Sequence, residues 1–569
     1  MNESARAAAL QQAEYFLHHE TQFHLGCLPT EQPHPATVGL DEVCRRDTAA
    51  GVAMLRKVDR DILPRAAAVF AAPEYQHLTA VLEQTLRRGG RIGFSGCGAT
   101  GRLSILLEAA WRKACRSGRY PEAQQYEDRV FSIMTGGDYA LVRSVEFFED
   151  YESFGRRQAR DRQIGPQDAL IAITEGGETS SVLGSALEAA DAGAAVFLAF
   201  NNPADILCEK IERSRRAIRD PRLTVLDLHT GPMAIAGSTR MQAVTTELLV
   251  IGQALETVFA RIAGLSGNAL PEPVAVFATL LDELDAEANR RTLAAAIEFE
   301  EDVYRRRGLV TYFADQTLLD IFTDTTERAP TFMLPPFVKS DDPVSPQSWA
   351  FVKNPLRSTA QAWDAVYARP PRCLEWTLAD YRAMGADERL LAAPPRIGAD
   401  ELAKFPIGKE KAVARLRQTT PSVAVAVLAD SDVDAAFLPS FARRAADFSD
   451  HRILHIGRET ADAWNIVCRV PATPLGLWER LAVKLVMNTL STLTMTRLGR
   501  VQSNWMAWVE TSNKKLIDRG ARLIAELCGL SYENACRELF ISNAEIAAAD
   551  WTGKAKPSPV QYTVNRLRQ

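Results

Sequence analysis

Residues 91–106 read Arg-Ile-Gly-Phe-Ser-Gly-Cys-Gly-Ala-Thr-Gly-Arg-Leu-Ser-Ile-Leu, and this stretch decides the fold. The apolar run 92–94 predicts the end of a buried strand, and the small residues 95–101 predict a tight turn. Beyond the turn, the apolar residues recur at helical spacing: Leu103, Leu106, Leu107 and Ala110. Such a strand, turn and helix start together direct free backbone N–H groups and the positive end of a helix dipole at one point, which suits a phosphate.

Two other interpretations of this turn bear on function. It lacks Gly-Lys-Ser or Gly-Lys-Thr, so the sequence does not support a nucleotide-binding P-loop. Glycines are also needed wherever a strand and a helix cross closely. A purely structural turn therefore remains an alternative at this point.

Length and composition narrow the class of protein. The 569 residues suggest three or four structural units at about 150 residues each, and the 47% hydrophobic and 24% charged content is that of a soluble globular protein. A net charge of −5 without a dense basic run argues against a nucleic-acid partner. The sequence shows neither an apolar stretch of about 18 residues nor a signal peptide, so we expect no membrane partner and a cytoplasmic location.

Cysteine and histidine usage argues against metals and disulfides. The nine cysteines lie far apart with no Cys-x-x-Cys pair, and the eight histidines are scattered with no His-Glu-x-x-His. We therefore expect neither a disulfide framework nor a metal site, and no cofactor.

After helices over residues 1–90, short apolar runs alternate with helices. The predicted strands are 91–95, 130–134, 169–174, 195–200 and 223–227, and a long helix follows from about 239 to 262. Continuous apolar runs separated by helices indicate an α/β fold with a parallel sheet that is covered on both faces.

The same scheme recurs after a joint at 264–273. Its predicted elements are a strand at 309–313, a helix at 317–326, and strands at 423–428 and 453–456; we expect the proline-rich residues 333–372 to cross the surface. Two such domains can pack as a pseudo-dimer, with ligands at the carboxyl ends of the strands. We therefore divide the chain into a helical segment (1–50), a first domain (51–265), a second domain (266–518) and a short helical C-terminal segment (519–569).

Four further segments could carry chemistry, and each also has a plain structural explanation. Gly136-Gly137-Asp138 leads toward Glu149, which could be a solvated surface acid. Residues 174–181 follow a buried strand, where a second phosphate-binding turn would fall. Residues 237–240, Gly-Ser-Thr-Arg, could simply cap the long helix. The lysine pair in Thr511-Ser-Asn-Lys-Lys515 could simply be solvated.

The motifs become specific when they are taken in order along the chain. They are Gly-Cys-Gly-Ala-Thr-Gly-Arg-Leu (96–103), Gly-Gly-Asp followed by Glu149-Asp150, Gly-Ser-Thr-Arg-Met (237–241), Asn-Thr-Leu-Ser-Thr (488–492), Leu-Gly-Arg-Val (498–501) and Ser-Asn-Lys-Lys-Leu (512–516). With this set the chain resembles the family that joins N-acetylmuramic acid 6-phosphate etherases to the glucokinase regulatory protein, both built on sugar-isomerase (SIS) domains. The resemblance covers about residues 40–265 and 295–530, and the tandem layout is similar to that of the regulatory protein.

The resemblance implies a role for each matching residue. The phosphate is expected on the turn that contains Cys97, Gly98, Ala99, Thr100 and Gly101, with further contacts from Thr174, Gly176 and Ser238. Of the two catalytic glutamates of the etherases, one corresponds to Glu149. The other belongs to a pattern Asp-x-x-Glu-x-x-Pro-Thr-Phe, and its position in the first domain is Ala110.

The second domain supplies the missing glutamate. Residues 324–332, Asp-Thr-Thr-Glu-Arg-Ala-Pro-Thr-Phe, match the pattern at every fixed position, so Glu327 could serve the first domain's phosphate turn in a pseudo-dimer, with Lys515 reaching across as well. Residues 313–316, Phe-Ala-Asp-Gln, stand where the second domain's own phosphate turn should be, without a glycine. We therefore expect one composite site that binds one phosphorylated sugar.

Two residues depart from the family pattern. Gln242 stands where a lysine is usual, and Glu178 stands where the relatives carry a small hydroxyl or an arginine. A carboxylate beside a phosphate dianion is repulsive unless it turns away or serves another group of the sugar.

The resemblance leaves three functions to weigh. The first is a carbon–oxygen lyase that opens the lactyl ether of N-acetylmuramate 6-phosphate, and the Ala-rich composition and short C-terminus favour it. The second is a regulator without catalysis, which responds to a sugar phosphate and has a sugar kinase as its partner. The third, aldose–ketose isomerisation, is disfavoured because these motifs contain no histidine.

Overall fold

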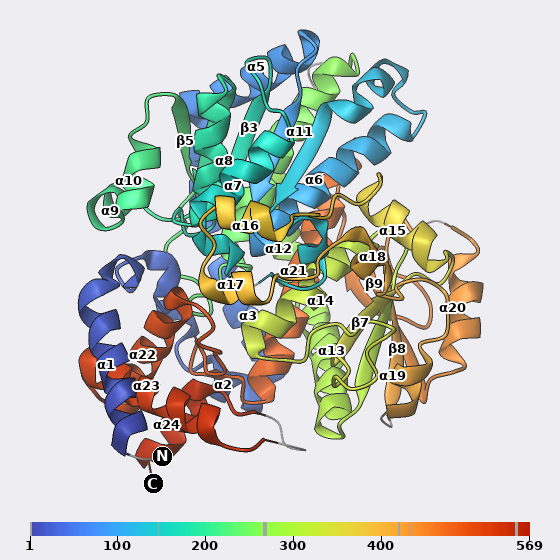
Figure 1. Cartoon of the computed structure of the whole chain (residues 1–569). Coiled ribbons are helices and arrows are strands. Elements are labelled where there is room, and N and C mark those ends of the chain that lie inside the picture. The colour runs from blue at the N-terminus through green and yellow to red at the C-terminus, as the bar shows by residue number, and fades with distance from the viewer. Residues whose placement is uncertain are drawn as a thin grey trace.

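Two parallel five-stranded sheets of the same topology form the two halves of the protein. The computed structural model describes residues 3–145, 147–265, 270–418, 421–432, 434–551 and 556–568, so part of the predicted joint at 264–273 lies outside the described residues. The first sheet has the order β2-β1-β3-β4-β5 and the second the order β7-β6-β8-β9-β10. All strand pairs within these two sheets are parallel, so the predicted α/β class with two parallel sheets is confirmed (Figure 1).

The first half agrees closely with the sequence pattern. Its strands are β1 (Ile92–Gly96), β2 (Val130–Met134), β3 (Ala169–Ile173), β4 (Ala195–Phe200) and β5 (Leu223–Asp227). Its helices are α6 (Gly98–Arg116), α7 (Glu152–Asp161), α8 (Ser180–Asp191), α9 (Ala204–Lys210), α10 (Glu212–Ile218) and α11 (Gln242–Ile262). Leu170 and Ala172 of β3 pack with α8, whereas Ile171 and Ile173 join the core on the opposite face, so both faces are covered.

The second half repeats this arrangement. Its strands are β6 (Leu309–Phe313), β7 (Ala350–Lys353), β8 (Ser422–Ala429), β9 (Asp450–Gly457) and β10 (Trp464–Val467). Its helices are α12 (Pro273–Leu284), α13 (Glu287–Arg305), α14 (Leu318–Phe332), α15 (Thr359–Tyr367), α16 (Leu378–Ala383), α17 (Glu388–Ala392), α18 (Ala399–Ala403), α19 (Val413–Gln418), α20 (Phe437–Ala445) and α21 (Leu477–Arg497).

The expectation that residues 333–372 only cross the surface is wrong. Strand β7 pairs with β6 at the edge of the sheet and is buried along its length, and α15 follows it. The prolines at 343, 346 and 355 lie before and after the strand and do not interrupt it, so they are compatible with an edge strand.

Helices at the two ends of the chain pack together. Residues 3–87 form α1 (Glu3–His19), α2 (Leu40–Arg46), α3 (Thr48–Asp59), α4 (Ile62–Ala71) and α5 (Pro73–Arg87). A short hairpin of β11 (Val501–Gln502) and β12 (Trp505–Met506) precedes α22 (Lys514–Cys528), α23 (Tyr532–Ala548) and α24 (Pro559–Arg568). Because α1 packs on α23, and α22, α23 and α24 pack on one another, the two ends of the chain form one helical unit (Figure 1).

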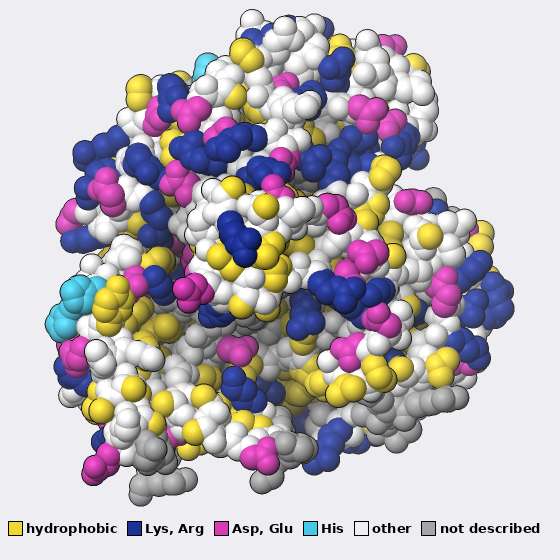
Figure 2. All heavy atoms as spheres, viewed as in Figure 1, with side chains coloured by type: hydrophobic (Ala, Val, Ile, Leu, Met, Phe, Trp, Pro, Cys, Tyr) yellow, Lys and Arg dark blue, Asp and Glu magenta, His cyan; other side chains and the backbone are white. Residues whose placement is uncertain are grey.

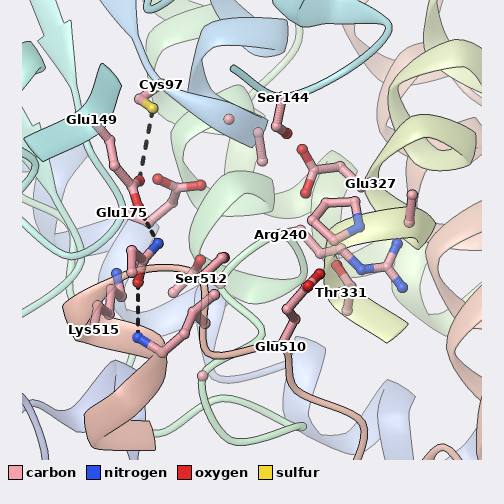
Figure 3. Close-up of a pocket in the computed structure, with 18 of the residues that line it drawn as sticks. Cys97, Ser144, Glu149, Glu175, Arg240, Glu327, Thr331, Glu510, Ser512 and Lys515 are labelled. Carbon is pink, nitrogen blue, oxygen red and sulfur yellow. Dashed lines mark hydrogen bonds between the residues drawn. The ribbon is translucent and has the colours of Figure 1, made fainter. Parts of the chain in front are cut away.

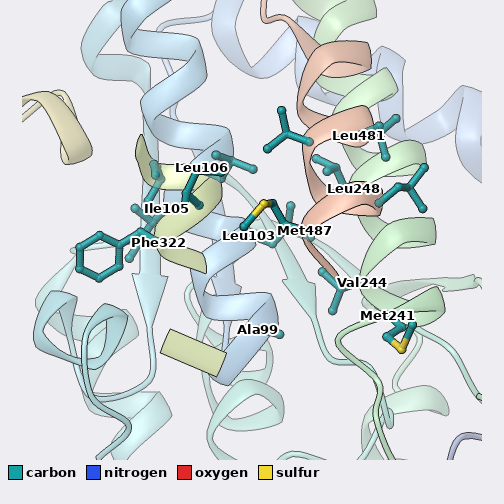
Figure 4. Close-up of a cluster of buried hydrophobic side chains, with 14 of the residues drawn as sticks. Ala99, Leu103, Ile105, Leu106, Met241, Val244, Leu248, Phe322, Leu481 and Met487 are labelled. Atoms are coloured by element: carbon teal, nitrogen blue, oxygen red, sulfur yellow. The ribbon is translucent and has the colours of Figure 1, made fainter. Parts of the chain in front are cut away.

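Four helices join the two halves as a pseudo-dimer. Helix α6 packs against α14, and α11 packs against α21. Their contacts bury Leu103, Val244, Leu248, Phe322 and Leu481, among others (Figure 4). Helix α11 is long and apolar enough to cross a membrane, but 94% of its most apolar window is buried inside the protein, as expected for a core helix.

A buried charge network crosses the same interface. Arg240, which precedes α11, donates to Asp324 of α14 at 3.0 Å, and Arg328 binds the other carboxylate oxygen. Ser491 of α21 also donates to Asp324, at 2.8 Å. Burial alone would raise the pKa of Asp324, but the charges of Arg328 and Arg240 hold it below its usual value.

We predict that Asp324→Ala severely destabilises the protein. The change leaves the buried guanidinium group of Arg240 without its carboxylate and removes one of the two carboxylate partners of Arg328, which keeps Glu300. Breaking a buried ion pair on one side typically costs roughly 3–5 kcal/mol. Chemical denaturation should show this loss, whereas Asp302→Ala, which removes an exposed carboxylate paired with Arg306, should change the unfolding free energy by less than about 1 kcal/mol. Equal unfolding free energies for the two variants would contradict the prediction.

Candidate active site

The two halves enclose a cavity of about 290 Å³ at the carboxyl ends of the first sheet's strands. Its lining includes Glu149 from the first half and Glu327 from the second. Lys515, at the start of α22, lines it as well. Figure 3 shows these side chains entering the cavity from different elements of the chain, as the composite-site hypothesis requires.

The glycines of the turn between β1 and α6 have two different tasks. A Cβ on Gly96 would lie 2.4 Å from the backbone of Thr100, so Gly96 permits the close crossing of strand and helix. Gly98 has a φ of +53° and borders the cavity, and a Cβ there would have no atom within 4 Å. The turn is therefore a structural crossover and also leaves open space at the N-terminus of α6, where helical N–H groups have no intrahelical partner.

The residues expected to bind the phosphate or another part of the sugar divide into two groups. Cys97, Gly98, Ala99 and Ser238 line the cavity, whereas Thr100, Gly101, Thr174, Gly176 and Glu178 are not among its lining residues. The second group shapes the turns: the Thr100 hydroxyl donates to the carbonyl of Cys97 at 2.8 Å, and the hydroxyls of Thr174 and Thr179 share a hydrogen bond of 2.9 Å. Thr179, from the same second turn, reaches the cavity.

Glu149 lies on the short helical turn Phe148–Asp150. Its carboxylate accepts a hydrogen bond of 2.7 Å from Asn513, the N-cap residue of α22, so the C-terminal segment helps to hold it. Burial raises the pKa of Glu149 to about 7, although the positive charge of Lys515 opposes this shift. A carboxyl group with a pKa near neutrality is suited to general acid–base work.

Glu327 lies on α14 and forms an ion pair with Arg102 of α6. Arg102 is fully buried and also donates to the hydroxyl of Thr326 at 3.0 Å and to the carbonyl of Leu141 at 3.2 Å. A guanidinium fixed at so many points fixes the glutamate in turn, so Glu327 enters the cavity in a defined position.

The structure explains both departures from the family pattern. Glu178 binds Lys515 at 2.8 Å and Arg213 at 2.7 Å; burial would raise its pKa, but these two cations lower it to about 2. Its charge is therefore neutralised within the protein. Gln242 donates to Asp59 at 2.8 Å and accepts from the backbone N–H of Ala234, so it is part of the core.

Sequence reasoning missed Glu175, a third carboxyl group of the cavity. It comes two residues after the end of β3. Because the sequence analysis predicted a phosphate-binding turn at this place, the position of Glu175 could have indicated that it belongs to the site. Burial raises the pKa of Glu175 to about 7, and the nearby charges of Glu327 and Glu149 add to the shift. Arg240, Glu510 and Asn513 also line the cavity and were not predicted.

The corresponding turn of the second half is occupied by its own side chains. Asp315 follows β6, where the first half has its glycine-rich turn, and accepts from Asn354 at 2.7 Å and from Arg357 at 2.9 Å. Within the described residues, no group of three or more His, Cys, Asp or Glu side chains is placed to hold a metal ion.

Comparisons with known proteins agree with this architecture. The family model described as "Glucokinase regulatory protein N-terminal SIS domain" matches residues 75–190. An N-acetylmuramic acid 6-phosphate etherase of Deinococcus radiodurans is 33% identical over 256 residues, which are 44% of this chain and 75% of that protein. Another, of Thermosynechococcus vestitus, is 32% identical over 295 residues, 51% of this chain and 87% of that protein.

Solved structures of phosphosugar isomerases are more distant. A putative phosphosugar isomerase of Silicibacter pomeroyi matches with a TM-score of 0.37 and 13% identity, over 78% of this chain and 98% of that one. Tagatose-6-phosphate ketose/aldose isomerase of Escherichia coli matches with a TM-score of 0.42 and 12% identity, over 83% and 98%. Likenesses at this level carry no argument about the site.

Two SIS-type halves that share one cavity define the class of protein. The chain belongs to the family of the N-acetylmuramic acid 6-phosphate etherases and the glucokinase regulatory protein, as its motifs indicated.

We predict that Ala99→Asp abolishes phosphate binding in the cavity without unfolding the protein. Ala99 stands in the first turn of α6, where a carboxylate is compatible with the helix dipole but occupies the position of an anion. Calorimetric titration with a sugar 6-phosphate should show affinity at least about tenfold lower, a change of 1.4 kcal/mol. Ala67→Asp on the exposed face of α4 is the control, and unchanged affinity in Ala99→Asp would contradict the prediction.

We also predict a pH-dependent gain of stability in Glu149→Gln. Because burial raises the folded-state pKa of Glu149 to about 7, protonation stabilises the fold at low pH, and this stabilisation is lost as the pH rises through about 7. Glutamine does not titrate, so the variant should melt above the wild type at pH 8, with a smaller difference at pH 5. Exposed Glu74→Gln should show no such trend. A difference that is the same at both pH values would count against this account.

Proposed function

We propose that this protein is an enzyme that acts on a sugar 6-phosphate, and specifically a carbon–oxygen lyase that opens the lactyl ether of N-acetylmuramate 6-phosphate. The observation that carries the proposal is the meeting of Glu149 and Glu327, from different halves, in one cavity beside the N-terminus of α6. The names of the relatives support the choice of substrate.

In the proposed complex the helix terminus holds the phosphate. The backbone at Gly98 and Ala99 and the hydroxyl of Ser238 line this part of the cavity. The cations that line the cavity already have carboxylate partners: Arg240 binds Asp324, Lys515 binds Glu178 and Arg519 binds Glu31. Backbone N–H groups and hydroxyls therefore provide most of the phosphate contacts, with Lys515 adding long-range attraction.

The proposed chemistry is an elimination in the open-chain sugar. Glu149 takes the proton from C2, which the C1 aldehyde makes acidic, because a base with a pKa near 7 combines the correct protonation state with driving force. The electron pair forms the C2–C3 double bond as the C3–O bond breaks, and the ether oxygen leaves with lactate. Glu327, held by Arg102, donates the proton that the departing oxygen needs and takes a proton back from the water that adds in the next step.

Addition of water to the double bond then completes the reaction. Hydration returns a hydroxyl to C3 and a proton to C2, so the products are N-acetylglucosamine 6-phosphate and lactate. Both Glu149 and Glu175 have pKa values raised to about 7 and line the cavity, so each could return this proton.

We predict that Glu149→Gln and Glu327→Gln each lower turnover by about 10²–10⁴ while substrate affinity changes little, since loss of a general acid or base typically costs this much. Lactate release from N-acetylmuramate 6-phosphate measures turnover, and calorimetry measures affinity. Glu74→Gln is the control for the charge change.

One outcome would replace the enzyme with a regulator. If the wild type binds a sugar phosphate but releases no lactate, and both glutamine variants lose affinity, the glutamates are ligand acceptors and the protein is a sugar-phosphate-responsive regulator.

A further inference from the structure

A second cavity, of about 240 Å³, lies where the two halves meet on the other side of the Gly136–Asp138 turn. One wall comes from the first half, with Gln158 of α7 and Arg162 just after this helix. The opposite wall is the segment 372–376 of the second half. Met134 lines both this cavity and the active site, so the two are neighbours.

The segment that closes this cavity is firmly attached to the first half. The backbone of Arg372 forms two hydrogen bonds with Asp138. Its N–H donates to the Asp138 carboxylate at 2.6 Å, and its carbonyl accepts from the backbone N–H of Asp138 at 3.1 Å. Farther along, Trp376 packs on Phe148 and Phe154. The cavity is therefore bounded by residues of both halves that are held in place by specific contacts.

The carboxylates around the cavity all have partners. Asp138 binds Arg369, and Asp161 binds Arg157 and the indole N–H of Trp376. Glu375 accepts from the backbone N–H of Ala399. Glu108, just behind the cavity, binds three arginines: Arg112, Arg369 and Arg372.

Arg162 is the exception among the charged groups. Its side chain lines the cavity and forms no hydrogen bond or ion pair with any residue in the part of the chain that the structure describes. Burial lowers the pKa of Arg162; the negative charge of Asp138 opposes this shift, and the positive charge of Arg369 adds to it. A half-buried guanidinium in this state gains from any anion that can reach it.

The charge of Arg372 is also only partly compensated, because the Glu108 carboxylate that it binds is shared with two other arginines. Burial lowers the pKa of Arg372 to about 10. The negative charge of Glu108 opposes this shift, whereas the positive charges of Arg369 and Arg162 add to it. The positive charges of Arg162, Arg369 and Arg372 thus act on one another, and the single carboxylate of Glu108 is shared by Arg112, Arg369 and Arg372. Figure 2 shows Lys and Arg side chains gathered on the first half above the α16–α17 segment, which favours the approach of an anion.

We propose that this cavity binds a small oxyanion, a carboxylate or a phosphate, which Arg162 and Arg372 hold between the two halves. Both arginines present planar N–H pairs that match such groups. Trp376 and the Cys373 side chain form the less polar wall, so the ligand is a small metabolite with an apolar part and one oxyanion group. This site is separate from the phosphate turn at α6 and does not depend on the proposed function.

Because the ligand would touch both halves, it should stabilise their interface. Gly137 and Asp138 also line the cavity and begin the segment that leads to Glu149. Occupancy should therefore raise the melting temperature of the whole chain, since a ligand that binds only the folded state stabilises it.

The test uses the full-length chain in the Ala99→Asp background, so that anion binding at the active site is removed. Inorganic phosphate and lactate are titrated separately by calorimetry and by thermal shift, and the tighter of the two identifies the oxyanion. We expect one binding event per chain. Adding Arg162→Gln should weaken it at least about tenfold, the effect of losing one charge-assisted hydrogen bond.

The matched control is Arg160→Gln, which removes the same charge from the exposed end of α7, where Arg160 binds Glu188 outside the cavity. This variant should bind the anion as the parent does. Circular dichroism establishes that each variant is folded. The proposal is overturned if neither anion binds, if Arg162→Gln binds as tightly as its parent, or if Arg160→Gln weakens binding equally.

Discussion

The contact of Arg240 with Asp324 is the interaction on which the rest of the structure depends. Both side chains are buried, one from each half, and Asp324 also receives Arg328 and Ser491. Three residues after Asp324, on the same helix, comes Glu327, and Arg240 itself lines the cavity. The ion pair therefore helps to fix the position of Glu327, on one half, relative to the glycine-rich turn of the other half. A site divided between two domains needs such a rigid joint, because catalysis tolerates little misplacement.

The two halves differ in their glycine-rich turns and in the presence of the glutamate. The protein therefore has one composite site, although its repeated topology would allow two. Ala110 and Glu327 stand the same number of residues after Gly96 and Phe313, which end β1 and β6. The first half thus keeps the open turn and lacks the glutamate, whereas the second keeps the glutamate and fills its turn with Asp315. Neither half is complete alone, and only one of the two cross-domain combinations unites a glycine turn with a carboxylate.

The sequence predicted what depends on short-range patterns. Strands such as β3, Ala-Leu-Ile-Ala-Ile, are continuous apolar runs and can be recognised alone. Strands β7 and β10 were missed because each has only four residues, and β10 carries a polar Asn465. The presence of Glu149 and Glu327 in one cavity followed from the motifs of the family that the chain resembles. The pairing of Glu178 with Lys515, which are far apart in the chain, and the entry of Glu175 into the cavity depend on tertiary packing that no local pattern encodes.

The balance of charge in the cavity follows from the same packing. Glu149, Glu175 and Glu327 line it together, close to the glycine-rich turn. Burial raises the pKa of Glu149 and of Glu175 to about 7. Because burial raises the pKa of both groups, they hold protons more readily than exposed glutamates, and the cavity carries less negative charge than its composition suggests. Glu178, which burial would otherwise also protonate, is instead neutralised by Lys515 and Arg213. Glu149 and Glu175 are therefore suited to exchanging protons near neutral pH, whereas Glu178 stays in ion pairs that hold the shape of the site.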